Sequence, residues 1–202
     1  MSASTMQVIT SLLAVLALSG TVFLLVSRLL AARWPVADRF VGAVHDSSLW
    51  LAWLVTATAT LGSLWFSEVA DYVPCRLCWF QRVCMYPLAG ILLIAAWRRD
   101  RSVRWYALPL LVAGIGVSSY HSLIEWKPWL DSGACGVGPS CTDVWFRRFG
   151  FLTLAVMAAI AFSTVLALLF VTPRPGVSDD EQGDRSVGMV AEERESSGKV
   201  GA

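Results

Sequence analysis

The sequence predicts an all-α integral membrane protein, and three observations support that prediction. The chain is 56% hydrophobic and only 15% charged, whereas about a quarter of the residues in a soluble domain are charged. Several apolar stretches approach the length of about 20 residues that a helix needs to cross a bilayer. No β-type alternation competes, and helices satisfy their own backbone hydrogen bonds in lipid. A net charge of +1, without a basic cluster interleaved with aromatic residues, gives no support for nucleic-acid binding.

Five segments qualify, or nearly qualify, as membrane spans. They are Met6–Ser27, Ser48–Phe66, Cys78–Trp97, Trp105–Ile124 and Gly150–Val171. The first could also be a cleaved signal peptide, but such peptides carry basic residues before their apolar run. Residues 1–7 carry none, and three arginines follow the run instead. We therefore expect an uncleaved N-terminal span.

The arginines also predict which side of the membrane each loop faces. The short loop 98–104 contains four arginines, and the positive-inside rule places such a loop in the cytoplasm. The N-terminus and the loops 67–77 and 125–149 then face outward. The tail 173–202 is then cytoplasmic, and its polar composition, rich in Gly, Ser, Asp and Glu, is typical of a disordered segment.

Four of the five cysteines lie in the two outward loops, and the fifth, Cys84, lies inside a span. One loop carries Cys75 and Cys78 in a C-x-x-C motif, and the other carries Cys135 and Cys141. Disulfides persist on the outer side of a bacterial membrane and are uncommon in the cytosol. A buried cysteine is usually a small, inert apolar residue, so we expect no redox role for Cys84.

Two interpretations of the loop cysteines describe a non-enzymatic membrane adaptor. In the first, the pairs are structural disulfides. A Cys135–Cys141 bond could staple the glycine-rich segment 136–140, whereas a Cys75–Cys78 bond closes so small a ring that it removes little chain entropy. In the second, all four thiols bind one zinc ion. The C-x5-C spacing is loose for that role and no nearby histidine completes a standard pattern, so we expect no metal ligand among them.

A thiol–disulfide relay explains the surroundings of the C-x-x-C motif best. Pro74 can initiate a helix, which places Cys75 and Cys78 in its first turns, where the helix dipole favours a thiolate. Arg82 follows Cys78 by four residues on the same helix face, so its charge favours that thiolate further. An arginine at the edge of a span needs a partner, such as a thiolate or a carbonyl oxygen of a bound ligand. Snorkelling to the lipid headgroups is the alternative.

These motifs resemble the disulfide bond formation protein B (DsbB) family, and most closely its BdbC-type branch. The resemblance rests on CRLCWFQR at 75–82, MYP at 85–87, SSYH at 118–121, the Cys135…Cys141 pair, and FGF at 149–151. It implies a four-helix transmembrane bundle of DsbB type plus one additional N-terminal transmembrane helix. The chain would then divide into that helix with a cytoplasmic loop (1–47), a four-helix core with two redox loops on its outer face (48–172), and the tail (173–202).

The resemblance also implies a function. Members of this family are quinone-linked thiol–disulfide oxidoreductases in the bacterial cytoplasmic membrane. They are multi-pass proteins surrounded by membrane lipid, and their redox loops face the extracytoplasmic side. They reoxidise a thioredoxin-fold oxidase of the DsbA or BdbD type and pass its two electrons to a membrane quinone, either menaquinone or ubiquinone.

Residue roles follow from the same resemblance. By position, Cys75 and Cys78 resemble the quinone-proximal pair, and Cys135 and Cys141 resemble the pair that exchanges with the partner. The order within the family implies that Cys135 forms the mixed disulfide with the partner. Cys141 would then bridge transiently to Cys75, which leaves Cys78 as the thiolate that faces the quinone. Arg82 matches the quinone-site arginine of the family.

His121 is a second candidate for the quinone site, because an imidazole can hydrogen-bond to a quinone carbonyl or carry a proton. Glu125 follows one helical turn later and could orient the ring or end the helix in water. A histidine satisfied by a helix neighbour or by interfacial water is the alternative.

A vitamin K epoxide reductase-like enzyme would also pair a membrane C-x-x-C with loop cysteines. The place of the motif before the third of five spans, followed by Gln81 and Arg82, favours the DsbB type.

Overall fold

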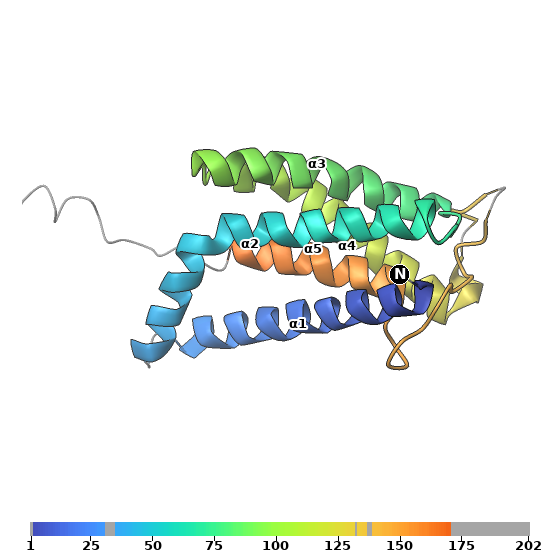
Figure 1. Cartoon of the computed structure of the whole chain (residues 1–202), viewed down its shortest axis with the longest axis horizontal. Coiled ribbons are helices and arrows are strands. Elements are labelled where there is room, and N and C mark those ends of the chain that lie inside the picture. Colours follow the sequence, from blue (N-terminus) through green and yellow to red (C-terminus); the bar gives the residue numbers. More distant parts are fainter. Residues whose placement is uncertain (1, 31–34, 132, 137–138, 171–202) are drawn as a thin grey trace, which may run out of the picture. The chain divides into compact units, whose positions relative to one another are not determined.

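A computed structural model describes residues 2–30, 35–131, 133–136 and 139–170 of the chain (Figure 1). The elements, in chain order, are α1 (Ala3–Leu30), α2 (Pro35–Glu68), α3 (Arg76–Arg98), α4 (Val103–Trp126), the 3-10 helix η1 (Pro128–Leu130) and α5 (Leu154–Phe170). Within these ranges the only extended pairing is an isolated antiparallel bridge between Arg148 and Leu152. The predicted all-α membrane fold is confirmed. The predicted disordered tail, 173–202, lies outside the described residues.

Four of the described helices are long and apolar enough to cross a membrane. They are α1, the segment Val44–Glu68 of α2, α3 and α4. With 17 residues, α5 is apolar but shorter. The prediction that the last span starts at Gly150 is wrong, because Phe149 and Gly150 adopt positive φ values of 53° and 80° and turn the chain before α5 begins at Leu154. The predicted end of that span, Val171, lies outside the described residues.

The second helix starts earlier than the predicted second span. It begins at Pro35, and proline suits the first turn of a helix because the N–H that it lacks would have no partner there. Figure 1 shows that the first turns of α2 run in a different direction from the part that lies beside α3. The region predicted as a loop between the first two spans is therefore largely helical.

The helices α2 to α5 form a bundle in which each helix contacts the next and α5 closes against α2. The first helix, α1, packs against α5 and α2. The centre consists of fully buried apolar side chains, including Leu88 of α3, Leu111 of α4 and Phe162 of α5. Gly114 lets α4 and α5 approach closely, because a Cβ at that position would overlap the Phe162 ring.

Both cysteine-bearing segments lie at the same end of the bundle as the N-terminus (Figure 1). Gln7 of α1 joins them. Its Nε2 donates a hydrogen bond to the Tyr72 hydroxyl at 2.8 Å, and Arg148 Nη2 donates one to its Oε1 at 3.1 Å. Tyr72 precedes the C-x-x-C motif and Arg148 follows the second cysteine pair. The fold therefore brings the two loops together, as the predicted topology requires.

Candidate active site

Cys75 caps the N-terminus of α3. Its backbone is extended, with φ −72° and ψ 172°, and its Sγ accepts a hydrogen bond from the Cys78 N–H at 3.4 Å. A cap side chain that accepts from the first turn lies at the positive end of the helix dipole, where a thiolate is stabilised. Pro74 immediately precedes the cap. The prediction that the C-x-x-C pair lies at the start of a helix is confirmed.

The two thiols of the motif are in contact. Their Sγ atoms are 2.8 Å apart, with Cys75 buried and Cys78 partly buried. The pKa of the Cys75 thiol is lowered to about 4, chiefly by the hydrogen bond from the Cys78 thiol. His121 and the Cys78 N–H lower it as well, and together these effects outweigh the opposing effect of burial. In the reduced pair the negative charge therefore rests on Cys75.

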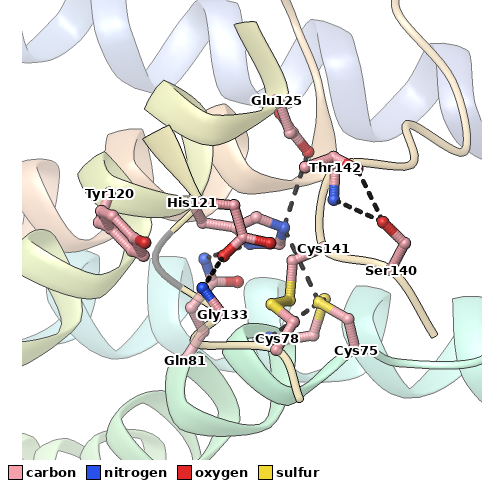
Figure 2. Close-up of a disulfide and its surroundings, with 12 residues drawn as sticks. Cys75, Cys78, Gln81, Tyr120, His121, Glu125, Gly133, Ser140, Cys141 and Thr142 are labelled. Carbon is pink, nitrogen blue, oxygen red and sulfur yellow. Dashed lines mark hydrogen bonds and ion pairs between the residues drawn. A yellow bond between two sulfur atoms is a disulfide. The ribbon is translucent and has the colours of Figure 1, made fainter. Parts of the chain in front are cut away.

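The second pair forms a disulfide between Cys135 and Cys141, with 6.0 Å between their Cα atoms. Gly133 and Gly136 adopt positive φ values of 77° and 58°, which let the loop turn back on itself. Both cysteines pack with Cys75 in one buried cluster, and Figure 2 shows the disulfide beside the C-x-x-C pair. The interpretation as one four-cysteine zinc site loses support, because two of its thiols are bonded to each other.

His121 of α4 lies beside the C-x-x-C pair, on the same side as the loop disulfide (Figure 2). Its Nε2 is 3.8 Å from Cys75 Sγ and 3.9 Å from Glu125 Oε1. Its Nδ1 is 3.2 Å from Gln81 Nε2. Because an amide nitrogen only donates, the neutral ring carries its hydrogen on Nε2, the nitrogen that faces the thiol. His121 can therefore donate a hydrogen bond to a Cys75 thiolate.

Glu125 is buried, with 9% of its surface exposed, so it does not end the helix in water. Thr153, just before α5, donates a hydrogen bond from Oγ1 to Glu125 Oε2 at 2.6 Å. Cys75, His121, Glu125 and Thr153 thus form a row of buried polar groups that connects three helices. Such a row can hold a proton close to the reacting sulfur, because each member stabilises the charge of its neighbour.

Three potential metal-ligand atoms, from Cys75, Cys78 and His121, lie within 4.8 Å of one another. Two thiolates on one tetrahedral zinc ion, each about 2.3 Å from the metal, would lie about 3.8 Å apart. The two sulfur atoms here are 2.8 Å apart. This spacing fits a redox pair better than a metal site.

A cavity of about 530 Å³ adjoins Cys78 of the C-x-x-C pair. Cys78 and Arg82 line it, and His121 is not among the described residues of its wall. Apolar side chains of α1, α2, α3 and α5 form most of the wall, and Tyr72 and Trp145 of the two loops, stacked with 4.5 Å between their rings, complete it. Cys78 therefore lines an apolar cavity, whereas Cys75 packs with the loop disulfide.

Arg82 is held in place by α2. Its Nε donates to Ser63 Oγ at 3.0 Å and its Nη2 donates to the Ser63 carbonyl oxygen at 3.1 Å. Its guanidinium carbon lies 5.3 Å from the centre of the Trp79 ring. These contacts offset the cost of placing a cation at the edge of a membrane span. They also fix the guanidinium on the wall of the cavity that Cys78 lines.

Tyr86 has a buried hydroxyl with no hydrogen-bond partner among the described residues. It lines the cavity, and it lies one helical turn beyond Arg82 and two beyond Cys78 on the same face of α3. An unpaired buried donor is costly, and an acceptor atom on a ligand would remove that cost. A quinone fits these residues, because its carbonyl oxygens can accept hydrogen bonds from Arg82 and Tyr86 while its apolar part contacts the apolar walls.

Gln81, Tyr86 and Thr153 were not predicted to have roles. Gln81 and Tyr86 lie inside the motif segments, and their helical spacing from Cys78 and Arg82 was a usable signal. No signal in the sequence pointed to Thr153, because its contact with Glu125 depends on how α5 packs against α4.

Comparison with known proteins connects this site to one family. The family model described as disulfide bond formation protein DsbB matches residues 45–172, which is more than half of the chain. A probable disulfide formation protein of Deinococcus radiodurans is 44% identical over 136 residues, covering 62% of this chain and 88% of the relative. Disulfide bond formation protein C of Bacillus subtilis is 40% identical over 124 residues, covering 61% and 88%. No solved structure gives a significant match.

A third relative, a probable disulfide formation protein of Coxiella burnetii, is 46% identical over 120 residues, covering 58% of this chain and 82% of the relative. The family match includes both cysteine pairs, Arg82 and the buried polar row, and it leaves out α1. These names favour the predicted DsbB type over the vitamin K epoxide reductase-like alternative. The chain therefore belongs to the DsbB family of disulfide bond formation proteins and is a multi-pass membrane disulfide oxidoreductase.

Proposed function

We propose that the protein takes two electrons from a thioredoxin-fold oxidase of the DsbA or BdbD type, passes them through its two cysteine pairs, and delivers them to a membrane quinone. One observation carries this proposal: Cys75 packs with the Cys135–Cys141 disulfide, and Cys78, whose Sγ is 2.8 Å from Cys75 Sγ, lines the cavity. A pair in that position can exchange with a thiol from the aqueous side and with an acceptor dissolved in lipid.

On the aqueous side, a partner thiolate attacks Cys135, which breaks the Cys135–Cys141 bond and releases Cys141 as a thiolate. Cys141 then attacks Cys75 of an oxidised Cys75–Cys78 pair, and Cys78 leaves with the electron pair of the broken bond. The second thiol of the partner resolves the mixed disulfide and releases Cys135. Cys135 re-forms its bond with Cys141 and releases Cys75. The products are an oxidised partner and a reduced Cys75–Cys78 pair, so atoms and electrons balance.

Cys75 is well suited to leave as a thiolate in the last of these exchanges. Its pKa is lowered to about 4, and a thiol of lower pKa leaves faster. Nε2 of His121 faces its sulfur and can donate a hydrogen bond to it. We therefore assign His121 to the exchange side of the pair, with Glu125 as the positioning residue behind it.

On the cavity side, Arg82 and Tyr86 hold the quinone head group near Cys78 by donating hydrogen bonds to its carbonyl oxygens. When bound, a quinone would accept the two electrons of the reduced Cys75–Cys78 pair and two protons, one from the Cys78 thiol and one from solvent, because Cys75 is already a thiolate. Cys75 and Cys78 re-form their disulfide at the same time. The positive charge of Arg82 favours Cys78 as the thiolate that is released when Cys141 attacks Cys75, as the helical spacing predicts.

The topology also supports an orientation. The loop 98–104, which carries four arginines, lies between α3 and α4 at the end opposite the cysteine pairs. The positive-inside rule places that loop in the cytoplasm and both redox loops on the extracytoplasmic face of the bacterial membrane. A disulfide-forming partner is expected on that face, where disulfides persist.

Anaerobic mixing of the purified protein with a reduced thioredoxin-fold C-x-x-C partner and a menaquinone or ubiquinone analogue tests the proposal. Quinone absorbance should fall only when the partner thiols are present, and Cys78→Ser should abolish the change. Cys84→Ser is the matched control, because Cys84 is a free cysteine buried in the central core and should leave the rate unchanged. Full turnover by Cys78→Ser, or no reduction of either quinone by the folded wild type, would overturn the proposal.

A further inference from the structure

We infer that α1, together with α2 and α5, forms a groove that binds the isoprenoid tail of the quinone. This inference rests on the proposed function and extends it, because α1 lies outside the segment 45–172 that matches the family. It assigns a role to α1, the additional N-terminal helix, which is not part of the four-helix core.

The cavity continues far beyond the head-group site. Its wall follows α1 from Thr10 to Leu24, a distance of about 21 Å at the helical rise of 1.5 Å per residue. Val44 of α2 and Leu168 of α5 line it toward the cytoplasmic end. Cys78 is near the other end, in the first turn of α3. A quinone ring would fill only the part near Cys78, so the remaining length calls for a long apolar group attached to that ring.

The surface of this groove is apolar and is shaped by small residues. The small residues of α1 on its wall are Thr10, Ala14, Ala17, Gly20 and Thr21. At Gly20 a Cβ would meet no atom within 4 Å, so the space beside this helix is open there. A flexible hydrocarbon chain gains free energy when it leaves water for such a surface, and a narrow groove also supplies close contacts on several sides.

The groove also opens sideways between α1 and α2. Two of its lining residues are largely exposed, Leu16 of α1 at 68% and Leu54 of α2 at 54%. In a membrane these side chains face the hydrocarbon region. A molecule dissolved in the bilayer can therefore enter between the two helices without crossing water.

Polar contacts hold α1 in register with the groove. Gln7 bonds to Tyr72, which lines the head-group end of the cavity. Farther along, Thr21 Oγ1 donates a hydrogen bond to Thr164 Oγ1 of α5 at 2.9 Å. Contacts at two levels fix both the height and the rotation of α1, as a helix that contributes to a binding site requires.

The occupant that this geometry favours is the tail of the bound quinone, because the groove is continuous with the wall that carries Cys78 and Arg82. A lipid acyl chain would find the same apolar surface but would gain nothing from the head-group site. The two occupants therefore differ in one respect that can be measured. Only a tail tethered to the quinone ring couples occupation of the groove to electron transfer.

Gly20→Phe tests the inference, because Gly20 lines the groove and a Cβ there would meet no atom within 4 Å. We expect the KM for a long-tailed quinone to rise by about tenfold, while the KM for a tailless quinone stays within about twofold of wild type. Gly20→Ala controls for helix propensity. Val22→Phe controls for an added aromatic ring, because Val22 is 51% exposed and does not line the cavity. Both controls should match wild type with both quinones.

A quinone with a photoreactive group in its tail supplies a readout that does not depend on turnover. Crosslinks mapped by mass spectrometry should fall on α1 between Thr10 and Leu24 and on the facing part of α2, and Gly20→Phe should remove them. Equal KM changes for both quinones, or crosslinks confined to α3 and α4, would overturn the inference and leave the proposed function intact. Failure of the wild type to reduce either quinone would instead overturn the proposed function and this inference with it.

Discussion

Nε2 of His121 lies 3.8 Å from Sγ of Cys75, so an imidazole of α4 faces the thiol that caps α3. The two residues are 46 positions apart in the chain, and their contact depends on the packing of α3 against α4. This contact lowers the pKa of the thiol, both through the hydrogen bond and through the charge of a protonated ring.

Replacement of His121 by Ala should raise the pKa of Cys75. The wild-type pKa of about 4 means that Cys75 is a thiolate at pH 7 and that its alkylation rate falls only as the pH approaches that value. In His121→Ala the midpoint should move to higher pH, because both favourable contacts are lost. Mass spectrometry of iodoacetamide-treated protein in a Cys84→Ser background measures the midpoint. An unchanged midpoint would show that His121 does not act on Cys75.

Tyr86→Phe should weaken quinone binding without harming the fold. Loss of one hydrogen bond to a carbonyl corresponds to about 0.5–1.5 kcal/mol, or roughly a two- to tenfold rise in KM for the quinone. The unfolding temperature without quinone should stay the same or rise, because the variant removes a buried donor that has no partner among the described residues. Tyr106→Phe is the matched control, because Tyr106 is 70% exposed. A KM equal to wild type would remove Tyr86 from the head-group site.

Thr153→Val should destabilise the protein by about 1–3 kcal/mol, because it leaves a buried Glu125 oxygen without its donor. The change in side-chain volume is small, so the effect reports the hydrogen bond of 2.6 Å. Thr60→Val is the matched control, since the Thr60 hydroxyl is buried without a partner and its removal should be neutral or stabilising. Thermal unfolding in detergent compares the two. Equal effects would show that the bond to Glu125 contributes nothing.

Gly114→Ala should destabilise the bundle by about 1–3 kcal/mol, because the added methyl group overlaps the buried Phe162 ring and forces overpacking. Gly90→Ala offers the opposite expectation at a similar helical position. A Cβ at Gly90 meets no atom within 4 Å, so alanine should stabilise α3 by up to about 1 kcal/mol through helix propensity. Unfolding temperatures of the two variants should lie on opposite sides of wild type. A stabilised Gly114→Ala would contradict the close packing of α4 and α5.

Hydropathy and the placement of the cysteines were sufficient to predict the helices and the juxtaposition of the two outer loops. The helix boundaries were less predictable. Pro35 starts α2 well before the apolar run begins, because a helix can extend beyond the hydrocarbon region. Gly150 belongs to a turn, because the preceding Phe149 also adopts a positive φ that ends regular structure there. Such conformations depend on local packing that hydropathy does not report.

The contact between His121 and Cys75 could not be predicted from the sequence. Arg82 was expected near Cys78 from helical spacing, and both line the cavity. His121 was expected at the quinone site, and that role stays a prediction; the structure places its Nε2 3.8 Å from Cys75 Sγ. Spacing fixes which residues share a face of one helix, but the rotation of α4 relative to α3 depends on packing along their whole length.

The hydrogen bonds of α1 also constrain how the protein is assembled during its synthesis. Gln7 and Thr21 bond to Arg148 and Thr164, residues 141 and 143 positions later in the chain. Because α1 precedes α5 in the chain, its contacts with the end of the bundle form only after α5 has been inserted. Until α5 arrives, Thr21 lacks its contact with Thr164, and Arg148, which bonds to Gln7, lies only six residues before α5. A nascent chain halted before α5 would hold both members of the C-x-x-C motif and yet lack a closed bundle.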